Sequence, residues 1–221
     1  MKVLVFAPHN DDEVLGVGGT IRHHVKVGDE VTVCEVTSGP LCKVLQAEAR
    51  KAHALLGVSK SIFLNLPASE LADYPKTELN DRVGKVVKQV EPQIVYIPFI
   101  GDMHLDHRYV TEAALVAVRP INNCPVKNVY MYETLSETGW NTPYGERNFT
   151  PNLWVDISDH IEVKIAAMEC YESQIKEYPN PRSKDAIRAL AMYRGSTVSF
   201  PYAEAFMIVR EIRDRGQITN T

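Results

Sequence analysis

The segment VLVFAPHNDDE, residues 3–13, determines the expected fold. Its first part, Val3–Phe6, is continuously apolar, which is typical of a strand that is covered on both faces in a parallel sheet. The polar and acidic run from Pro8 to Glu13 ends this strand abruptly. The segment therefore predicts a buried strand with histidine and carboxylate side chains at its carboxyl end.

Four more strands are expected after this one, and helical patterns separate them. The expected strands are Val31–Val36, Ser61–Leu64, Ile94–Ile97 and Val129–Tyr132. The clearest helical patterns are Val14–Val27, Val44–Leu56 with Gly57 as its C-cap, and Glu78–Val90. This alternation predicts an α/β fold, a Rossmann-like and mostly parallel sheet with helices on both faces and the strand order 3-2-1-4-5.

The chain after Tyr132 predicts a C-terminal extension that closes the sheet. Its expected elements are a strand at Leu153–Val155, a helix from Ser158 to about Lys176, a helix over Ser183–Tyr193 and a closing strand at Ala205–Val209. No internal repeat and no dividing linker is evident, so residues 1–221 are expected to form a single domain.

The composition excludes several classes of protein. The 221 residues carry 24 lysines and arginines against 28 aspartates and glutamates, with no basic block, so binding to a nucleic acid backbone is not expected. The four cysteines form no Cys-x-x-Cys pair, and the apolar run Val3–Ala7 is too short for a signal peptide or a membrane span. These features predict a cytoplasmic protein with reduced thiols.

Two clusters of histidines and carboxylates follow the first and fourth strands. They are His9–Glu13 and Asp102–His107, and the predicted strand order brings the two strand ends together at the ligand crevice. A His/His/carboxylate set with one open position is typical of a catalytic zinc, whose bound water has a pKa of about 7. One carboxylate is then expected to bind metal and its neighbour to act as a base, and spacing alone does not distinguish Asp11 from Asp12.

The remaining histidines have no clustered carboxylate partners in the sequence and are interpreted as structural or solvent-facing. They are His23, His24, His53 and His160.

Six motifs together resemble the LmbE/PIG-L family of metal-dependent N-deacetylases. They are Ala7–Glu13, Gly18–Thr20, Leu55–Val58, His104–His107, Tyr171–Gln174 and Tyr202–Phe206, and they cover nearly the whole chain. The resemblance implies hydrolysis of the acetamide of an N-acetylated amino sugar, an N-acetylglucosamine-type conjugate. Members of the family often form trimers or hexamers, so a homo-oligomer is also an expectation of the resemblance.

The resemblance also implies the roles of individual residues. It assigns metal ligation to His9, Asp12 and His107, and the role of general base to Asp11. The expected metal is Zn2+, although this ligand set also accepts Fe2+, Mn2+ or Co2+.

Two further catalytic residues are implied at the second cluster. His104 would stabilise the oxyanion or protonate the leaving amine, and Asp106 would orient a histidine and tune its pKa.

The chain departs from the family pattern at several positions. Asn10 and Leu105 stand where proline is common. If Glu48 is the family's glutamate, Leu45 stands where many relatives carry a substrate-anchoring arginine. Candidate replacements for that arginine are Lys43, Gln46 and Arg50.

Two other features near the expected site have open roles. The loop Glu133–Asn152, with Trp140, Tyr144 and Arg147, is either a lid or sugar-stacking wall or an ordinary surface loop. Cys42 is interpreted as a bystander thiol.

Three alternative functions are weighed against deacetylation. A nucleotide-binding protein is suggested by Gly16–Gly19, but the last glycine of the fingerprint is missing and Asp11–Glu13 would repel a pyrophosphate, so close helix packing explains these glycines better. A metal-dependent phosphoesterase needs the same metal and water. A non-catalytic sugar-binding or metal-binding relative would need neither Asp11 nor His104.

Overall fold

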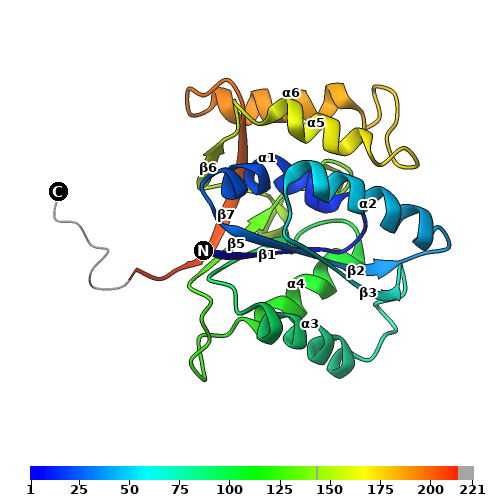
Figure 1. Ribbon diagram of the computed structural model, residues 1–221, viewed down its shortest axis with the longest axis vertical. Helices are drawn as coiled ribbons and strands as arrows, with labels where there is room; N and C mark the ends of the chain where they lie inside the picture. Colours follow the sequence, from blue (N-terminus) through cyan, green and yellow to red (C-terminus); the bar gives the residue numbers. More distant parts are fainter. Residues whose placement is uncertain (143, 214–221) are drawn as a thin grey trace.

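The computed structural model describes residues 1–142 and 144–213, which form a three-layer α/β arrangement (Figure 1). Seven strands make one sheet in the order β3-β2-β1-β4-β5-β7-β6, and the first five are parallel. The predicted order 3-2-1-4-5 is confirmed. The strands are β1 Lys2–Ala7, β2 Glu30–Ser38, β3 Lys60–Pro67, β4 Ile94–Pro98, β5 Asn128–Tyr132, β6 Leu153–Asp156 and β7 Ala203–Glu211.

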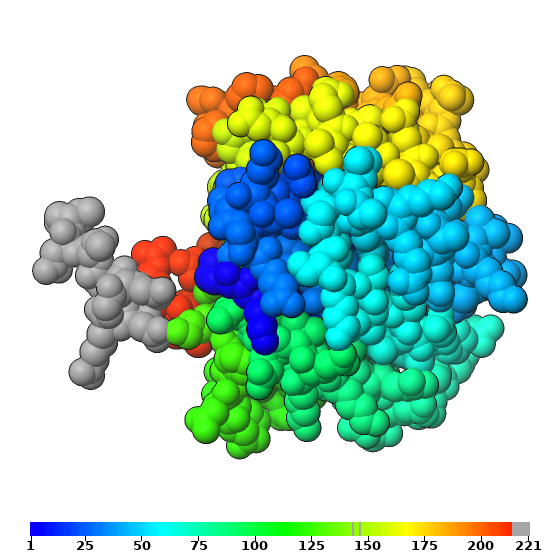
Figure 2. Space-filling model, viewed as in Figure 1, coloured from blue at the N-terminus to red at the C-terminus, as the bar shows by residue number. Residues whose placement is uncertain are grey.

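Helices cover both faces of the sheet. In Figure 1, α1, α2, α5 and α6 lie above it and α3 and α4 lie below it, and Figure 2 shows the yellow and orange C-terminal segment packed over α1 and α2. None of the helices in the described part of the chain is long and apolar enough to cross a membrane. Their bounds are α1 Asp12–Lys26, α2 Cys42–Leu56, α3 Lys76–Val90, α4 Leu105–Ala117, α5 Ile161–Glu169 and α6 Lys184–Ser196.

Strand β1 is apolar throughout because it supplies side chains to two separate cores. Val3 and Val5 belong to the core under α1 and α2, whereas Leu4 and Phe6 belong to the core over α3 and α4. All four side chains are fully buried. Burial on both faces explains the absence of a polar alternation in this strand.

The C-terminal elements close the sheet, with two differences from the prediction. β7 lies antiparallel between β5 and β6, so β6 rather than β7 is the edge strand. α5 ends at Glu169 instead of reaching Lys176. It ends there because the Ser173 N–H and hydroxyl donate to the Glu48 carboxylate, at 3.0 and 2.6 Å, which takes that backbone out of a helical ladder.

Close packing explains the glycines at the start of α1. A Cβ added to Gly16 would collide with the ring of Tyr132 on β5, whose hydroxyl donates to the Phe6 carbonyl at 2.8 Å. A Cβ at Gly19 would lie 2.7 Å from Ile157. The prediction that these glycines serve close helix packing is therefore confirmed.

We expect Gly16→Ala to lower the free energy of unfolding by about 1–3 kcal/mol, because the new methyl group overpacks the core against Tyr132. The matched control is Gly84→Ala in α3, where nothing lies within 4 Å of the added Cβ. That change is expected to stabilise the helix by about 0.5–1 kcal/mol. Urea denaturation measures both, and equal effects would contradict the packing explanation.

Candidate functional site

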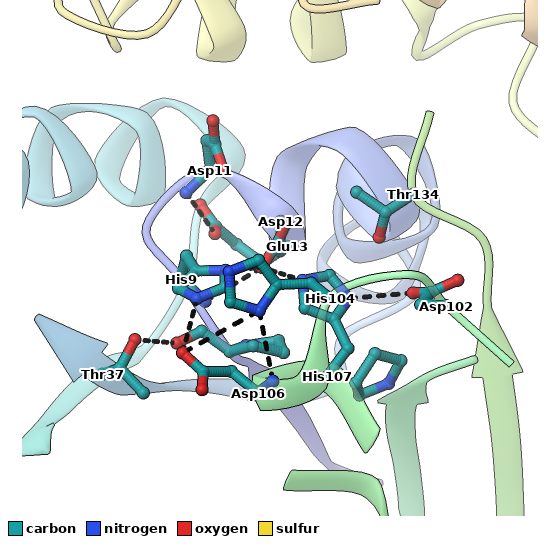
Figure 3. Close-up of polar contacts among 12 residues, drawn as sticks. His9, Asp11, Asp12, Glu13, Thr37, Asp102, His104, Asp106, His107 and Thr134 are labelled. Atoms are coloured by element: carbon teal, nitrogen blue, oxygen red, sulfur yellow. Dashed lines mark hydrogen bonds and ion pairs between the residues drawn. The ribbon is translucent and has the colours of Figure 1, made fainter. Parts of the chain in front are cut away.

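The two sequence clusters meet at the carboxyl ends of β1 and β4, as Figure 3 shows. Asp12 lies in the first turn of α1, and Asp106 and His107 lie in the first turn of α4. The second half of the second cluster is therefore helical rather than a loop, and His104 is the N-cap of its helix. Helix ends fix these side chains more firmly than a free loop would.

A His/His/carboxylate set lies at the centre of the site. The Asp12 Oδ2 atom is 3.4 Å from His9 Nδ1 and 3.2 Å from His107 Nε2. Ligand atoms of a tetrahedral site with bonds of about 2.0–2.1 Å lie about 3.3 Å apart, so these separations suit one divalent metal.

Buried atoms without partners also fit a metal. Asp12 Oδ1 and His107 Nε2 are buried and accept or donate no hydrogen bond among the described residues. Buried polar atoms normally have partners, so a shared ligand at this point would satisfy both. The donor set of two imidazoles and one carboxylate is the one that zinc and similar divalent metals take.

A second carboxylate holds the far nitrogen of each imidazole. Asp102 Oδ2 lies 2.8 Å from His107 Nδ1, and Asp106 Oδ2 lies 3.0 Å from His9 Nε2. Burial alone would lower the pKa values of both histidines, but the Asp106 and Asp12 carboxylates raise that of His9 to about 9, and Asp12 and Asp102 raise that of His107 to about 10. Each ring is thus oriented from behind, the pattern found at metal-ligating histidines.

Asp102 is a site residue to which sequence reasoning assigned no role. Its other oxygen accepts from the Thr138 hydroxyl at 2.5 Å, which ties the segment after β5 to the site. The available signal was a carboxylate five residues before His107. Spacing does not reveal which of Asp102 and Asp106 faces that ring.

Asp11 lies beside the candidate metal ligands in a strained conformation. Its φ of 106° is in the left-handed region that non-glycine residues rarely adopt, and its N–H donates to Glu13 Oε2 at 3.2 Å. Burial raises the pKa of its carboxyl to about 7, against the opposing charge of Arg182. Arg182 Nε donates to Asp11 Oδ2 at 2.8 Å.

His104 borders the site with its ring neutral. Its Nδ1 accepts the backbone N–H of Asp106 at 3.1 Å, so the proton of the neutral ring is on Nε2. Burial lowers the pKa of this ring to about 4, and the neighbouring His9 acts in the same direction. The Asp106 carboxylate is 4.0 Å from His104 Nδ1, so the histidine that it contacts directly is His9.

A pocket of about 350 Å³ opens at this site. Leu45 borders it, and Lys43, Gln46 and Arg50 are not among the described residues that do so. Gln46 bonds instead to Asn65, and Arg50 stacks over Phe63. The bordering residues are His9, Asn10, Asp11, Thr37, Ser38, Gly39, Leu45, Ala68, Ser69, His104, Glu137, Gln174 and Arg182.

The loop 133–152 contributes to the pocket only near its start. Glu137 borders the pocket, whereas Trp140 is 60% and Tyr144 79% exposed and neither borders it. Residue 143 of this loop lies outside the described residues. A stacking wall built from these two aromatic rings is therefore not seen in this arrangement.

Behind Asp11 lies a fully buried network that corrects the interpretation of His53. His53 Nε2 lies 3.3 Å from Glu13 Oε1 and 3.5 Å from Glu35 Oε1, so it does have carboxylate partners. Tyr171 donates to Glu13 Oε1 at 2.6 Å. Burial, and next the charge of Glu13, raise the pKa of Glu35 well above its usual range.

His24 also has a carboxylate partner, and its structural interpretation is confirmed. Its Nδ1 lies 2.7 Å from Asp29, and its Nε2 lies 2.9 Å from the Tyr96 hydroxyl. These contacts place it in a structural role away from the pocket.

Comparisons with known proteins give a consistent result. Residues 4–118 match the PIG-L family model, described as GlcNAc-PI de-N-acetylase. The chain is 28% identical over 230 residues to the diacetylchitobiose deacetylase of Thermococcus kodakarensis, covering 94% of this chain and 83% of that protein. It is 26% identical over 247 residues to a 1D-myo-inositol 2-acetamido-2-deoxy-alpha-D-glucopyranoside deacetylase from Mycobacterium sp. strain JLS, covering 86% and 80%.

A solved structure shows the same fold. The N,N'-diacetylchitobiose deacetylase from Pyrococcus horikoshii superposes with a TM-score of 0.77 and 26% identity, over 95% of this chain and 84% of that one.

We expect His53→Leu to lower the free energy of unfolding by about 3 kcal/mol, because it leaves two buried carboxylates without the imidazole between them. The control is Lys51→Ala on the same helix, whose ion pair with Glu172 is exposed and is expected to contribute less than about 1 kcal/mol. Urea denaturation compares the two, and a His53→Leu variant as stable as wild type would contradict a supporting role for the network.

Proposed function

The chain belongs to the PIG-L family of GlcNAc-PI de-N-acetylases, and we propose that it hydrolyses the acetamide of an N-acetylated amino sugar conjugate. In this proposal a bound divalent metal takes part in the reaction, and Zn2+ is the preferred metal. The observation that carries the proposal is the His9/Asp12/His107 set, of which Asp12 and His107 are buried, next to the Asp11 carboxylate at an open pocket. The named relatives act on substrates that contain an acetamido sugar.

In this proposal the metal is held by His9, Asp12 and His107, while Asp106 and Asp102 fix the ring orientations. A metal bound there supplies Lewis-acid polarisation and lowers the pKa of water to about 7. Fe2+, Mn2+ and Co2+ suit the same donors.

Asp11 is the proposed general base. Its Oδ2 is held by Arg182, whereas its Oδ1 is buried and has no hydrogen-bond partner among the described residues. Oδ1 is therefore the atom that accepts a proton from the attacking water. A carboxyl whose pKa burial raises to about 7 is suited to proton transfer near neutral pH.

His104 is the proposed donor to the oxyanion. Because its ring is neutral with the proton on Nε2, it can donate a hydrogen bond to the oxygen that gains charge in the tetrahedral state. The lowered pKa of His104 favours this role over protonation of the leaving amine.

The alternatives are less well supported by the site. A phosphoester would bring negative charge next to the carboxyl groups of Asp11 and Glu137, which border the pocket together with His9 and Arg182. A non-catalytic protein would not need a strained and buried Asp11. We also propose that residues 1–221 form one catalytic domain, since the sheet is continuous and the site combines residues from 9 to 182.

The test is acetate release by the zinc-loaded protein from a panel of N-acetylglucosamine conjugates. We expect metal-dependent release that falls by about 100- to 10,000-fold in Asp11→Asn, since a general base typically contributes that factor. Metal content, measured by mass spectrometry, should be unchanged in the variant. Release at the wild-type rate would remove Asp11 as the base, and no release from metal-loaded wild type would reject deacetylation of these sugars.

We expect Asp102→Asn to weaken zinc binding about 10- to 100-fold, because a neutral amide is a weaker acceptor for His107 Nδ1–H than the carboxylate and makes the ring a poorer ligand. Competition with a zinc chelator measures this affinity. The matched control is Glu112→Gln on α4, the helix that carries His107; Glu112 is exposed and pairs with Lys76. If Asp102→Asn binds zinc like wild type, Asp102 does not support metal binding through His107.

A further inference from the structure

Arg182 enters the pocket from the segment between α5 and α6, far along the chain from the metal ligands. Its backbone N–H donates to Asn180 Oδ1 at 2.9 Å, and the next residue, Ser183, caps α6 by accepting the Ala186 N–H at 3.1 Å. Its side chain is 28% exposed and borders the pocket. The guanidinium is therefore supported from behind and open to a ligand in front.

Among the described residues, the guanidinium of Arg182 has a hydrogen-bond partner for one of its three nitrogens. Nε donates to Asp11 Oδ2 at 2.8 Å, whereas the two terminal nitrogens donate to no described residue. The guanidinium is planar and presents its donors in a fixed fork, so the Nε contact also fixes the direction of the terminal nitrogens. Two parallel donors next to the proposed base thus lack an acceptor.

We propose that Arg182 anchors the substrate, with its two terminal nitrogens donating to neighbouring hydroxyl oxygens of the amino sugar ring. This inference rests on the proposed function. Asp11, the proposed base, acts at the acetamide, so Arg182 lies near the ring carbons next to the acetamido carbon. One of these, the anomeric carbon, carries the rest of the conjugate. The nearest free hydroxyl is therefore the 3-hydroxyl, on the other neighbouring carbon. The ring hydroxyl that follows completes the pair.

The mixed polar lining of the pocket suits the hydroxyl groups of a sugar. Arg182 is already paired with Asp11, and Asp12 and Glu137 add carboxyl groups to the same site. Ser38, Ser69 and Gln174 supply further neutral polar side chains. An uncharged polyhydroxyl ligand matches this lining, since a hydroxyl can accept a hydrogen bond from the guanidinium and donate one to a neighbouring carboxylate.

Arg182 also accounts for the leucine in α2. Leu45 borders the same pocket, and if Glu48 is the family's glutamate, Leu45 stands where many relatives carry an arginine. In this chain the guanidinium reaches the pocket from a different segment, one that the Ser173–Glu48 hydrogen bonds fasten to α2.

The experiment compares three probes: methyl 2-acetamido-2-deoxy-β-D-glucopyranoside, its 3-deoxy analogue and its 6-deoxy analogue. Kinetics are measured for zinc-loaded wild type, Arg182→Gln and Arg182→Lys. The control Lys184→Gln removes a positive charge two residues away, at a side chain paired with Glu169 outside the pocket. Urea midpoints confirm that each variant is folded.

We expect Arg182→Gln to lower kcat/KM for the parent sugar about 10- to 100-fold, mainly through KM, as for the loss of charge-assisted hydrogen bonds. In wild type, we expect a lower kcat/KM for the 3-deoxy sugar than for the parent sugar (the 3-deoxy penalty), and this difference should vanish in Arg182→Gln. The corresponding difference for the 6-deoxy sugar should be the same in both proteins. Arg182→Lys should recover little, because an ammonium lacks the fork. Lys184→Gln should match wild type.

An equal 3-deoxy penalty in wild type and Arg182→Gln would overturn the proposal. The proposal would also be overturned if Arg182→Gln lowered kcat but left KM and both deoxy penalties unchanged. Arg182 would then only hold Asp11 in position. If wild type releases no acetate, the proposed function fails separately. Calorimetric titration of the same three sugars into wild type and Arg182→Gln then decides the anchoring role, and equal affinities would reject it.

Discussion

Both halves of the site depend on the Asp12 carboxylate. One of its oxygens lies 3.4 Å from a nitrogen of His9 and 3.2 Å from a nitrogen of His107, and it also accepts the His9 backbone N–H at 2.9 Å. A buried carboxylate is unfavourable unless positive charge or hydrogen bonds compensate it. The pairing of β1 with β4 brings the two imidazoles to Asp12, so the strand order of the sheet is a condition for the site.

The sequence predicts the scaffold because its signals are local and periodic. The apolar run Val3–Phe6 reflects burial on both faces, and the helical spacing in Glu78–Val90 reflects one apolar stripe that packs on the sheet. The strand order then predicts that His9 and His107 meet. To predict that these two residues meet, it is enough to know where two adjacent strands end, and the positions of the strands in the sequence give these ends.

The remaining site residues depend on contacts that no periodicity encodes. Arg182 lies 171 residues from Asp11, and its approach depends on a segment without regular structure. The choice between Asp102 and Asp106 as the partner of His107 depends on side-chain direction in the first turn of α4. His53 looks isolated in the sequence because its carboxylate partners, Glu13 and Glu35, come from α1 and β2.

Because of the position of Arg182, metal binding and ligand preference depend on different parts of the chain. The candidate metal ligands are attached to strand and helix ends of the sheet, whereas the guanidinium is carried by the connection between α5 and α6. Exchange of that connection with the corresponding one from a homologue would alter the polar lining of the pocket and leave the histidines in place. Ligand preference can thus diverge through replacement of one surface connection, a change that the buried framework tolerates far more readily than a substitution among its own residues.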